Sequence, residues 1–248
     1  MRKVLIVTGG SRGIGAATAR LAGARGYAVC VNYRARKDEA ERVVADIRHR
    51  GGEAIAVQAD TASEADVARL FDVVDRELGP LDALVNNAGT TGTATMVADL
   101  DLANLQTVVA INVVGYFLCV REAIRRMATS RGGKGGAIVN VSSRASVLGG
   151  ANEWVHYAAS KGATDSMTVG LSREVGGLGI RVNAVRPGLI ETDIHAAAGR
   201  GDRLKTLSQM VPSGRIGSPE EVANTILWLL SDEASYVNGA LVDIGGGR

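Results

Sequence analysis

The sequence lacks an excess of charge of one sign, so a nucleic-acid or membrane partner is not expected. Its 28 Lys and Arg residues nearly balance its 26 Asp and Glu residues, and the formal net charge is +2. A balanced chain has no electrostatic reason to bind a polyanion or an anionic surface. The expected partner is therefore a small molecule.

The sequence also has few cysteines and no long apolar run. Cys30 and Cys119 both lie in apolar stretches, and neither joins a Cys/His cluster with metal-ligand spacing. We expect two buried, reduced thiols in a cytoplasmic protein that holds no metal. The apolar run from Val4 to Val7 is short, which indicates a strand and not a signal peptide. No run reaches the ~18 apolar residues of a membrane-spanning helix, so no span is predicted.

What the sequence does have is material for one core. At 248 residues, with 46% hydrophobic and 22% charged residues, it suits a soluble globular protein. Short apolar runs predict strands at 4–7, 27–33, 54–59, 81–85, 137–141, 180–185 and 241–244. The intervening segments predict helices at 16–25, 38–50, 63–78, 102–127, 157–176 and 219–230. With no linker and no internal repeat, residues 1–248 are predicted to form one α/β domain around a parallel sheet covered on both faces.

A glycine-rich turn follows the first predicted strand. It reads Thr8-Gly-Gly-Ser-Arg-Gly-Ile-Gly15 and leads into a helix of small residues. Glycines at these positions allow a sharp turn and a close approach of the backbone to a ligand. The N-terminus of the following helix would stabilise a pyrophosphate. The alternative, glycines that serve geometry alone, is less favoured because the turn opens a repeating β/α pattern.

The end of the second predicted strand indicates which nicotinamide cofactor fits. An acidic residue there would bind a ribose 2′-hydroxyl, whereas arginine accommodates a 2′-phosphate. The chain has Arg34, Arg36 and Lys37 in this stretch, with no acid before Asp38, and Arg12 of the glycine turn could reach the same place. Basic residues at a helix N-terminus oppose its dipole, which suggests an anion nearby. We therefore predict NADPH as the cofactor.

Tyr157 and Lys161 are four residues apart in a segment without a helix breaker. This spacing places both side chains on one helix face. A fixed ammonium beside a phenol favours the phenolate and should lower its pKa from about 10. Tyr157 could then act as a proton donor and acceptor, although a solvated helix can carry the same pair without any function.

Several polar residues stand where the predicted elements end or are interrupted. Asn86 and Asn87 end the fourth strand, where they could bridge strands, line a ligand crevice or only form a turn. Asn112 interrupts an apolar helix and is either a structural link or part of a proton relay. Ser142 and Ser143 end the fifth strand, where ligands bind in open α/β sheets or where a hydroxyl caps a turn.

Residues 193–213 lose strong periodicity just after the Pro187-Gly188 break. A polar, glycine-containing segment of this length beside a site is more often a binding flap than an idle loop. We predict a substrate lid over about 193–213 that becomes ordered when ligands bind.

Taken together, these motifs resemble those of the short-chain dehydrogenase/reductase family over nearly the whole chain. The resemblance is carried in order by Thr8-Gly-x-x-x-Gly-x-Gly15, Asp60, Asn86-Asn-Ala-Gly89, Asn112, Ser143, Tyr157-x-x-x-Lys161, Pro187-Gly188 and Thr192. It implies an α/β protein with a single Rossmann domain, a doubly wound seven-stranded parallel sheet and helices on both faces. It also implies a homotetramer.

The resemblance assigns roles to individual residues. The implied catalytic set is Asn112 for a relay water, Ser143 for polarising a carbonyl, Tyr157 for proton transfer and Lys161 for the nicotinamide ribose and the tyrosine pKa. Asp60 is implied to contact the adenine. The implied cofactor-binding residues are Gly9, Ser11, Arg12, Gly13, Ile14, Gly15, Tyr33, Arg34, Asp60, Thr61, Asn87, Ala88, Gly89, Tyr157, Lys161, Pro187, Gly188, Ile190 and Thr192.

One departure from the family pattern is the spacing between Ser143 and Tyr157, which is one residue longer than in many relatives. The extra residue is expected in the loop 149–154, and Ser142 remains a weaker candidate for the serine role. The same loop would face the substrate, so Trp154 and His156 are expected to shape specificity.

Three functions compete at this point. The first is reduction of a small ketone, sugar-like or quinone-like carbonyl by NADPH. The second is reduction of 3-oxoacyl groups on an acyl carrier protein, for which Lys134 could dock the acidic carrier, although Leu178 stands where such relatives often have arginine. The third is a non-catalytic dinucleotide-binding protein, which usually lacks the tyrosine or the lysine.

An oligomer is expected on physical grounds as well. Two surfaces have more apolar area than one sheet face can cover: the apolar helix around Tyr116 to Val120 and the small-residue face of the Tyr157 helix.

Overall fold

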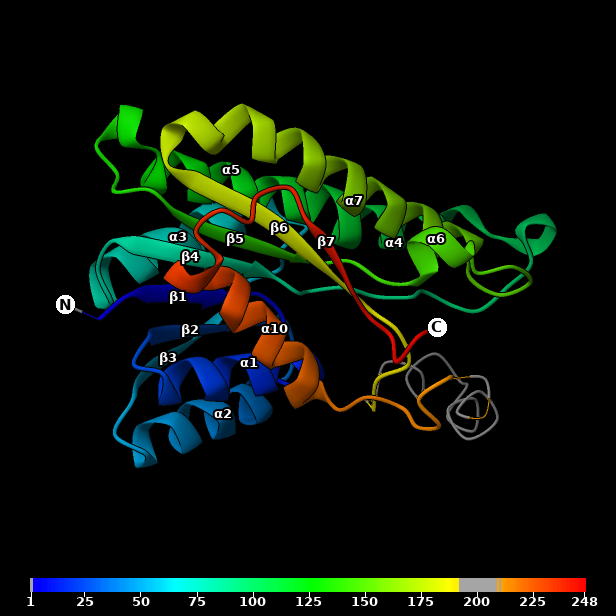
Figure 1. The fold of residues 1–248 in the computed structure, drawn as a ribbon, viewed down its shortest axis with the longest axis horizontal. Helices are drawn as coiled ribbons and strands as arrows, with labels where there is room; N and C mark the ends of the chain where they lie inside the picture. The colour runs from blue at the N-terminus through cyan, green and yellow to red at the C-terminus, as the bar shows by residue number, and fades with distance from the viewer. Residues whose placement is uncertain (1, 192–208, 210) are drawn as a thin grey trace.

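The strands form one parallel seven-stranded sheet, as the family resemblance implied, and their order is β3-β2-β1-β4-β5-β6-β7 (Figure 1). The structure is a computed structural model that describes residues 2–191, 209 and 211–248. The order reverses direction between β1 and β4, which makes the sheet doubly wound. The strands are β1 (Val4–Val7), β2 (Ala28–Tyr33), β3 (Glu53–Gln58), β4 (Leu81–Asn86), β5 (Gly136–Val141), β6 (Ile180–Pro187) and β7 (Leu241–Ile244).

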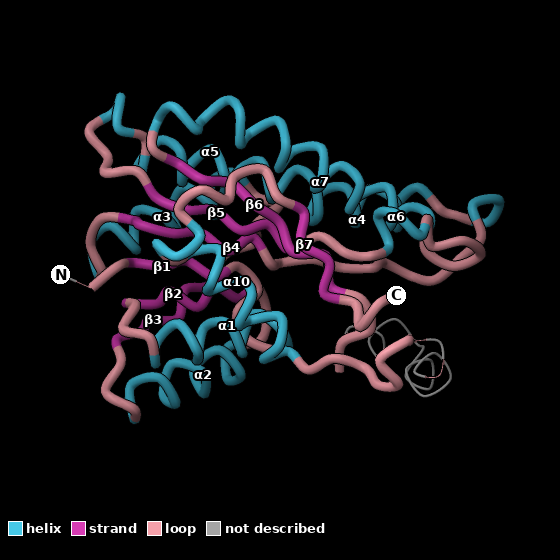
Figure 2. The backbone as a smooth tube through the Cα atoms, in the orientation of Figure 1, coloured by secondary structure: helices cyan, strands magenta, loops and turns pink. Residues whose placement is uncertain are grey.

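Helices cover both faces of the sheet (Figure 2). Residues of α1, α2 and α10 form the core on one face, and residues of α3, α5 and α7 form the core on the other. The described helices are α1 (Gly13–Ala24), α2 (Lys37–His49), α3 (Glu64–Glu77), α4 (Leu102–Val109), α5 (Gly115–Met127), α6 (Ala145–Leu148), α7 (Val155–Val175) and α10 (Pro219–Leu230).

The first strand shows why the apolar runs are continuous. Val4 and Ile6 join the core under α3, α5 and α7, whereas Leu5 and Val7 join the core under α1, α2 and α10. Side chains alternate across a strand, so a strand buried on both faces needs apolar residues at every position. The prediction of a two-sided parallel sheet from these runs is confirmed.

Three local features differ from the predicted elements. The helix expected over 102–127 is divided by a π-helical turn, Ala110–Val114, that carries Asn112. The sixth strand continues to Pro187, which pairs with Ile244, because a proline at the last position removes no needed ladder donor. The short helix α6 was not predicted, since one turn is too short to show a helical period.

The long segment Leu102–Met127 also has the length and mean hydropathy, 1.6, of a membrane-crossing helix, which the sequence reading did not expect. Its apolarity has a second explanation within the fold. Tyr116, Cys119 and Ala123 on its inner side are buried in the core against the sheet and α3. Core helices of soluble proteins pass the same test, so this is weak evidence for a membrane span.

The strands of the sheet all point the same way, so their carboxyl ends share one edge. The predicted catalytic and glycine-loop residues come from this edge. Thr192 and nearly all of the predicted lid lie outside the described residues, apart from residue 209 and residues 211–213.

Candidate active site

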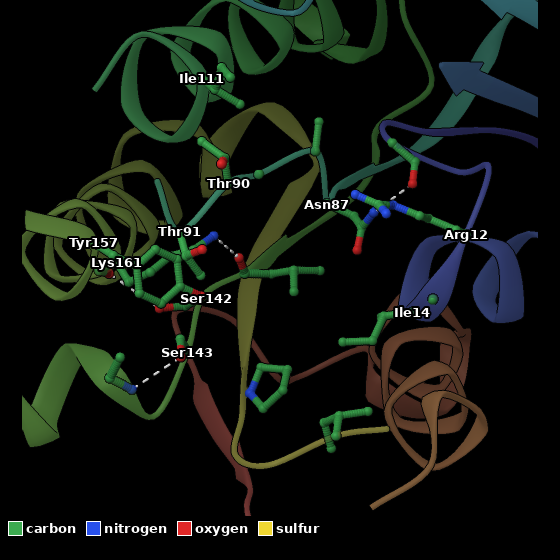
Figure 3. A pocket seen from close by; sticks show the side chains of 18 of the residues that line it. Arg12, Ile14, Asn87, Thr90, Thr91, Ile111, Ser142, Ser143, Tyr157 and Lys161 are labelled. Atoms are coloured by element: carbon green, nitrogen blue, oxygen red, sulfur yellow. Dashed lines mark hydrogen bonds between the residues drawn. The ribbon is translucent and has the colours of Figure 1, made fainter. Parts of the chain in front are cut away.

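A cavity of about 610 Å³ opens at the carboxyl ends of the strands. Figure 3 shows Ser143, Tyr157 and Lys161 on one side of it and Arg12, Ile14 and Asn87 on the other. The predicted site residues among its lining are Gly9, Ser11, Arg12, Gly13, Ile14, Tyr33, Arg34, Asp60, Thr61, Asn87, Ala88, Gly89, Ser143, Tyr157, Lys161, Pro187, Gly188 and Ile190. Gly15 and Asn112 stand behind this lining.

The glycine turn between β1 and α1 has the backbone geometry that its residues predict. Gly9 and Gly13 have φ values of 60° and 51°, in the left-handed region that other residues adopt only at a cost. A Cβ on Gly9 would lie 2.9 Å from the Cα of Ala88. A side chain at Gly15 would collide with the backbone oxygen of Gly9 and with Asn87. The turn therefore packs closely against the end of β4.

Asn87 fixes the turn from the side of β4. Its Nδ2 donates to the backbone oxygens of Thr8 at 2.9 Å and Gly9 at 3.0 Å, and its backbone N–H donates to the Thr8 hydroxyl at 2.9 Å. Asn87 thus bridges the ends of two strands and also lines the cavity. Two of the three alternatives that the sequence left open, bridging strands and lining a crevice, are therefore both correct for Asn87. Its neighbour Asn86 faces inward and donates to Asn140 on β5 at 3.1 Å.

Asn32 at the end of β2 holds the turn from the opposite side, and the sequence reading did not single it out. The Asn32 Oδ1 atom accepts from the N–H of Gly9 at 3.2 Å, and Nδ2 donates to the backbone oxygen of Ala59, just after β3, at 3.0 Å. A buried amide at a strand end must be satisfied. Its position just before the basic run was the sequence feature from which a role for Asn32 could have been predicted.

The N-terminus of α1 suits a phosphate group. No side chain caps it, and its first turn contains no acidic residue. Unpaired N–H groups and the positive end of the helix dipole favour an anion at this place. Together with the close glycine backbone, this end of α1 fits the pyrophosphate of a dinucleotide.

Arginines surround the part of the cavity next to the end of β2. Arg34 is 62% exposed and lies 3.9 Å from Asp60, a weak ion pair. Arg36 donates to Glu39 at 2.7 Å, and the first turn of α2 also contains Asp38. Acidic residues in the first turn of α2 therefore partly balance the basic run. Arg12 and Arg34 are the basic side chains on which the phosphate prediction depends.

Tyr157 and Ser143 form the polar centre of the cavity. Burial raises the pKa of Tyr157, and a hydrogen bond with Ser143 acts in the opposite direction. Ser143 also accepts from the backbone N–H of Ala145 at 3.1 Å, which orients its hydroxyl at the start of α6. Ser142 lines the cavity, but its hydroxyl donates to the backbone oxygen of Lys161 at 3.2 Å. The geometry favours Ser143 over Ser142 as the serine that faces a substrate.

Lys161 is buried, with 3% of its surface exposed. Its Nζ donates to the backbone oxygen of Val141 at 2.7 Å and to the hydroxyl of Tyr116 at 3.2 Å. It lies 5.9 Å from the ring centroid of Tyr157. Burial lowers the pKa of Lys161 to about 7, and the charge of Asp165 opposes that shift.

The expected lowering of the Tyr157 pKa by Lys161 is therefore not found in this structure. Burial dominates at the phenol, and the lysine interacts mainly with Val141 and Tyr116. Tyr116 is a participant that the sequence reading missed. The signal for it was present, because Tyr116 lies one helical turn after Asn112 and can share its face.

Asn112 is completely buried in the π-helical turn. Its Oδ1 accepts from the N–H of Thr90 at 2.9 Å, and its Nδ2 donates to the Thr90 oxygen at 2.8 Å and to the Ser160 hydroxyl at 2.9 Å. These bonds make Asn112 a structural link between the loop after β4 and α7. A π-helical turn is often found at functional sites.

The loop before α7 contributes Trp154 to the cavity wall, as expected. His156 is buried behind the lining, and its Nε2 is 3.1 Å from the backbone oxygen of Thr91. Burial lowers the pKa of His156. We infer that His156 supports the wall through Thr91, and that its expected contact with substrate is indirect.

Comparison with known proteins defines the class. A family model described as enoyl-(acyl carrier protein) reductase matches residues 9–248. The crystal structure of a short chain dehydrogenase from Burkholderia cenocepacia J2315 in complex with NADP superposes with a TM-score of 0.91 at 34% identity, covering 99% of this chain and 97% of that one. The chain belongs to the short-chain dehydrogenase/reductase family and is an oxidoreductase of that type.

Individual relatives cover the whole length of the chain. It is 51% identical over 245 residues to the uncharacterized oxidoreductase YgfF of Escherichia coli K12, with 99% of each chain covered. It is 37% identical over 246 residues to a 3-oxoacyl-(acyl-carrier-protein) reductase of Synechocystis sp., covering 99% of this chain and 96% of that protein. These comparisons support a nicotinamide dinucleotide as the cofactor.

Proposed function

We propose that the protein is an NADPH-dependent reductase that converts the carbonyl of a small ketone, sugar-like or quinone-like substrate to an alcohol, or catalyses the reverse reaction. The observation that carries this proposal is the hydrogen-bonded pair of Ser143 and Tyr157 in the same cavity as the glycine turn. A carbonyl that accepts a hydride develops negative charge on its oxygen, and two hydroxyl donors can stabilise that charge.

A bound nicotinamide cofactor would supply the hydride. Ser143 would donate a hydrogen bond to the carbonyl oxygen, and Tyr157 would pass its proton to the same oxygen. The raised pKa of Tyr157 keeps the phenol protonated at neutral pH, which suits the acid role in reduction. Lys161 would hold the ribose, and Asn112 would support a relay water. The glycine turn, Asp60 and the residues after β4 and β6 would bind the remainder of the cofactor.

The preference for NADPH is supported by Arg12 and Arg34, which line the cavity. A charge-assisted hydrogen bond contributes on the order of 1.5 to 3 kcal/mol, which corresponds to roughly tenfold or more in affinity. The pair between Arg34 and Asp60 is long, 3.9 Å. Arg34 can therefore turn toward a 2′-phosphate at little cost.

A second candidate is reduction of 3-oxoacyl groups on an acyl carrier protein, which the Synechocystis relative favours. Lys134 gives this candidate little support, because it precedes β5 and lies at the amino ends of the strands. There it lines a separate hollow with Lys3 and Asp232. Leu178, at the end of the turn that precedes β6, belongs to the same edge. Within one subunit, neither residue lies beside Tyr157.

The test is a screen of NADPH oxidation against ketones, sugars, quinones and acetoacetyl thioesters, free and carrier-bound. We expect turnover with at least one small carbonyl, and a loss of at least about a hundredfold in kcat for Tyr157→Phe. NADPH binding by that variant should be nearly unchanged. A variant that turns over at the wild-type rate would remove Tyr157 from the mechanism. A strong preference for carrier-bound acetoacetyl groups would favour the second candidate.

We also propose a homotetramer in the cytoplasm. Tyr116 and Val120, expected to offer apolar surface, are in fact buried in the core. The exposed apolar residues of the same helical segment include Leu102, Val114 and Phe117, which are 65%, 44% and 51% exposed. This surface supports self-association. The unbridged, buried Cys30 and Cys119 suit a reducing compartment.

A further inference from the structure

Beside the cavity, whose lining includes Arg144, four charged side chains from separate parts of the fold form a chain of ion pairs. Arg144 follows Ser143, Arg186 lies on β6 just before Pro187, Asp243 lies on β7, and Asp165 lies on α7. Asp243 is shared: its Oδ2 lies 2.5 Å from Nη1 of Arg144, and its Oδ1 lies 2.6 Å from Nε of Arg186. The chain ends at Asp165, 3.7 Å from Arg186.

Three of the four side chains are more buried than those of ordinary surface pairs. Arg144, Arg186 and Asp165 are only 19%, 16% and 13% exposed, whereas the shared Asp243 is 43% exposed. Exposed pairs contribute little, whereas removal of one partner from a desolvated pair leaves an uncompensated charge. Arg144 has a further constraint, because its Nε donates to the backbone oxygen of Arg248 at 2.8 Å. The guanidinium of Arg144 is thus held at two points.

The two arginines are attached to two parts of the site that have to be aligned. Arg144 is bonded to Ser143 through the backbone, and its own N–H donates to the oxygen of Pro187 at 2.9 Å. The turn at Pro187 and Gly188 is fixed to β7 as well, since the N–H of Gly188 donates to the oxygen of Ile244 at 2.9 Å. One carboxylate therefore connects the serine segment with the turn proposed to contact the cofactor.

We propose that Asp243 is a positioning residue that aligns Ser143 with the Pro187-Gly188 turn by clamping Arg144 and Arg186. This proposal rests on the function proposed above. A displacement of about 1 Å at a reacting group can cost up to a hundredfold in rate. The clamp would therefore act on the rate through Ser143 and on cofactor affinity through the turn.

The first experiment is a cycle between Ser143→Ala and Arg144→Met, measured with the best carbonyl substrate of the screen. Arg144→Met alone should lower kcat roughly tenfold and leave the Kd for NADPH within about threefold. In the Ser143→Ala background the same change should lower kcat by less than about twofold, because the group it positions is already gone. An equal loss in both backgrounds would show that Arg144 does not act through Ser143.

The second experiment measures NADPH binding by its fluorescence and thermal unfolding of the same samples. Asp243→Asn and Arg186→Met should each weaken NADPH binding by several fold, whereas Asp243→Glu should recover part of the loss. The matched control is Asp46→Asn, which breaks the 2.8 Å pair between Arg20 and Asp46 on the outer helices. If Asp243→Asn and Asp46→Asn bind NADPH equally well, the clamp is overturned.

The two experiments separate this proposal from the proposed function. Wild-type turnover for Tyr157→Phe would remove the proposed chemistry and leave the binding result standing. An inactive Tyr157→Phe, together with unaltered kinetics and binding for the clamp variants, would remove the clamp alone. If Arg144→Met unfolds at the assay temperature, Arg144→Lys keeps the charge and one contact, and it should show a smaller loss of kcat with the same dependence on Ser143.

Discussion

Removal of Lys161 should change how the stability of the cofactor-free protein depends on pH. Lys161 is buried, and burial lowers its pKa from 10.5 to about 7. Between these two pH values the unfolded chain holds a proton that the folded protein has lost. Stability therefore rises with pH across this interval, because the unfolded state binds more protons. Well below pH 7 both states are protonated, and the lysine contributes no slope.

The magnitude follows from the linkage relation. A full proton difference changes the free energy of unfolding by about 1.36 kcal/mol per pH unit. Half of the folded molecules still hold the proton at pH 7, so the gain of the wild type between pH 7 and pH 9 is about 2 kcal/mol. Lys161→Met keeps most of the side-chain volume and has no proton to exchange, so this part of the slope should vanish.

The assay is urea unfolding of both proteins without cofactor at pH 7, 8 and 9. Contributions of the other titrating groups cancel in the difference between the two curves. Lys134→Met serves as a control because Lys134 is exposed and lies at the opposite edge of the sheet. Parallel curves for wild type and Lys161→Met would show that the lysine is not desolvated in the folded protein, which would refute the reasoning.

Three further predictions concern the cofactor, the serine and the assembly. Arg34→Asp should move the ratio of kcat/KM values toward NADH by roughly tenfold or more, since it removes a phosphate contact and adds a repulsive charge. An unchanged ratio would exclude that contact. Ser143→Ala should lower kcat more than Ser142→Ala does; the reverse order would move the serine role by one residue. Light scattering at micromolar concentration should show an oligomer, and Phe117→Glu should shift it toward smaller species; a monomeric wild type would contradict the proposed tetramer.

Several features of the fold could be predicted from the sequence because they depend on local chemistry. The run from Val4 to Val7 gave the bounds of β1, and Ser218 with Pro219 gave the start of α10, where Ser218 and Glu221 form a complete capping box. Capping and burial on both faces of a strand are encoded within a few residues. The π-helical turn at Asn112 could not be predicted, since it depends on packing against Thr90 and Ser160. The helix α6 was missed because one turn is too short to show a helical period.

The candidate site shows the same division. The resemblance to the family implied Ser143, Tyr157 and Lys161, and the structure brings them to one cavity. The electrostatics of the site were not predictable, because a pKa depends on burial and on neighbours distant in sequence. Lys161 was expected to act on Tyr157, yet Val141 and Tyr116 are its hydrogen-bond partners.

The sequence by itself therefore determined the order of strands and helices, the glycine turn and the identity of the polar residues at the strand ends. These properties follow from hydrophobic periodicity and from the conformational limits of single residues. Only the tertiary structure decided that Asn32 and Asn87 hold the glycine turn from two sides, that Lys134 lies far from Tyr157, and that Asp243 joins Arg144 to Arg186. Each of these relations connects segments separated in the chain, and a parallel sheet brings such segments together only when the whole domain has folded.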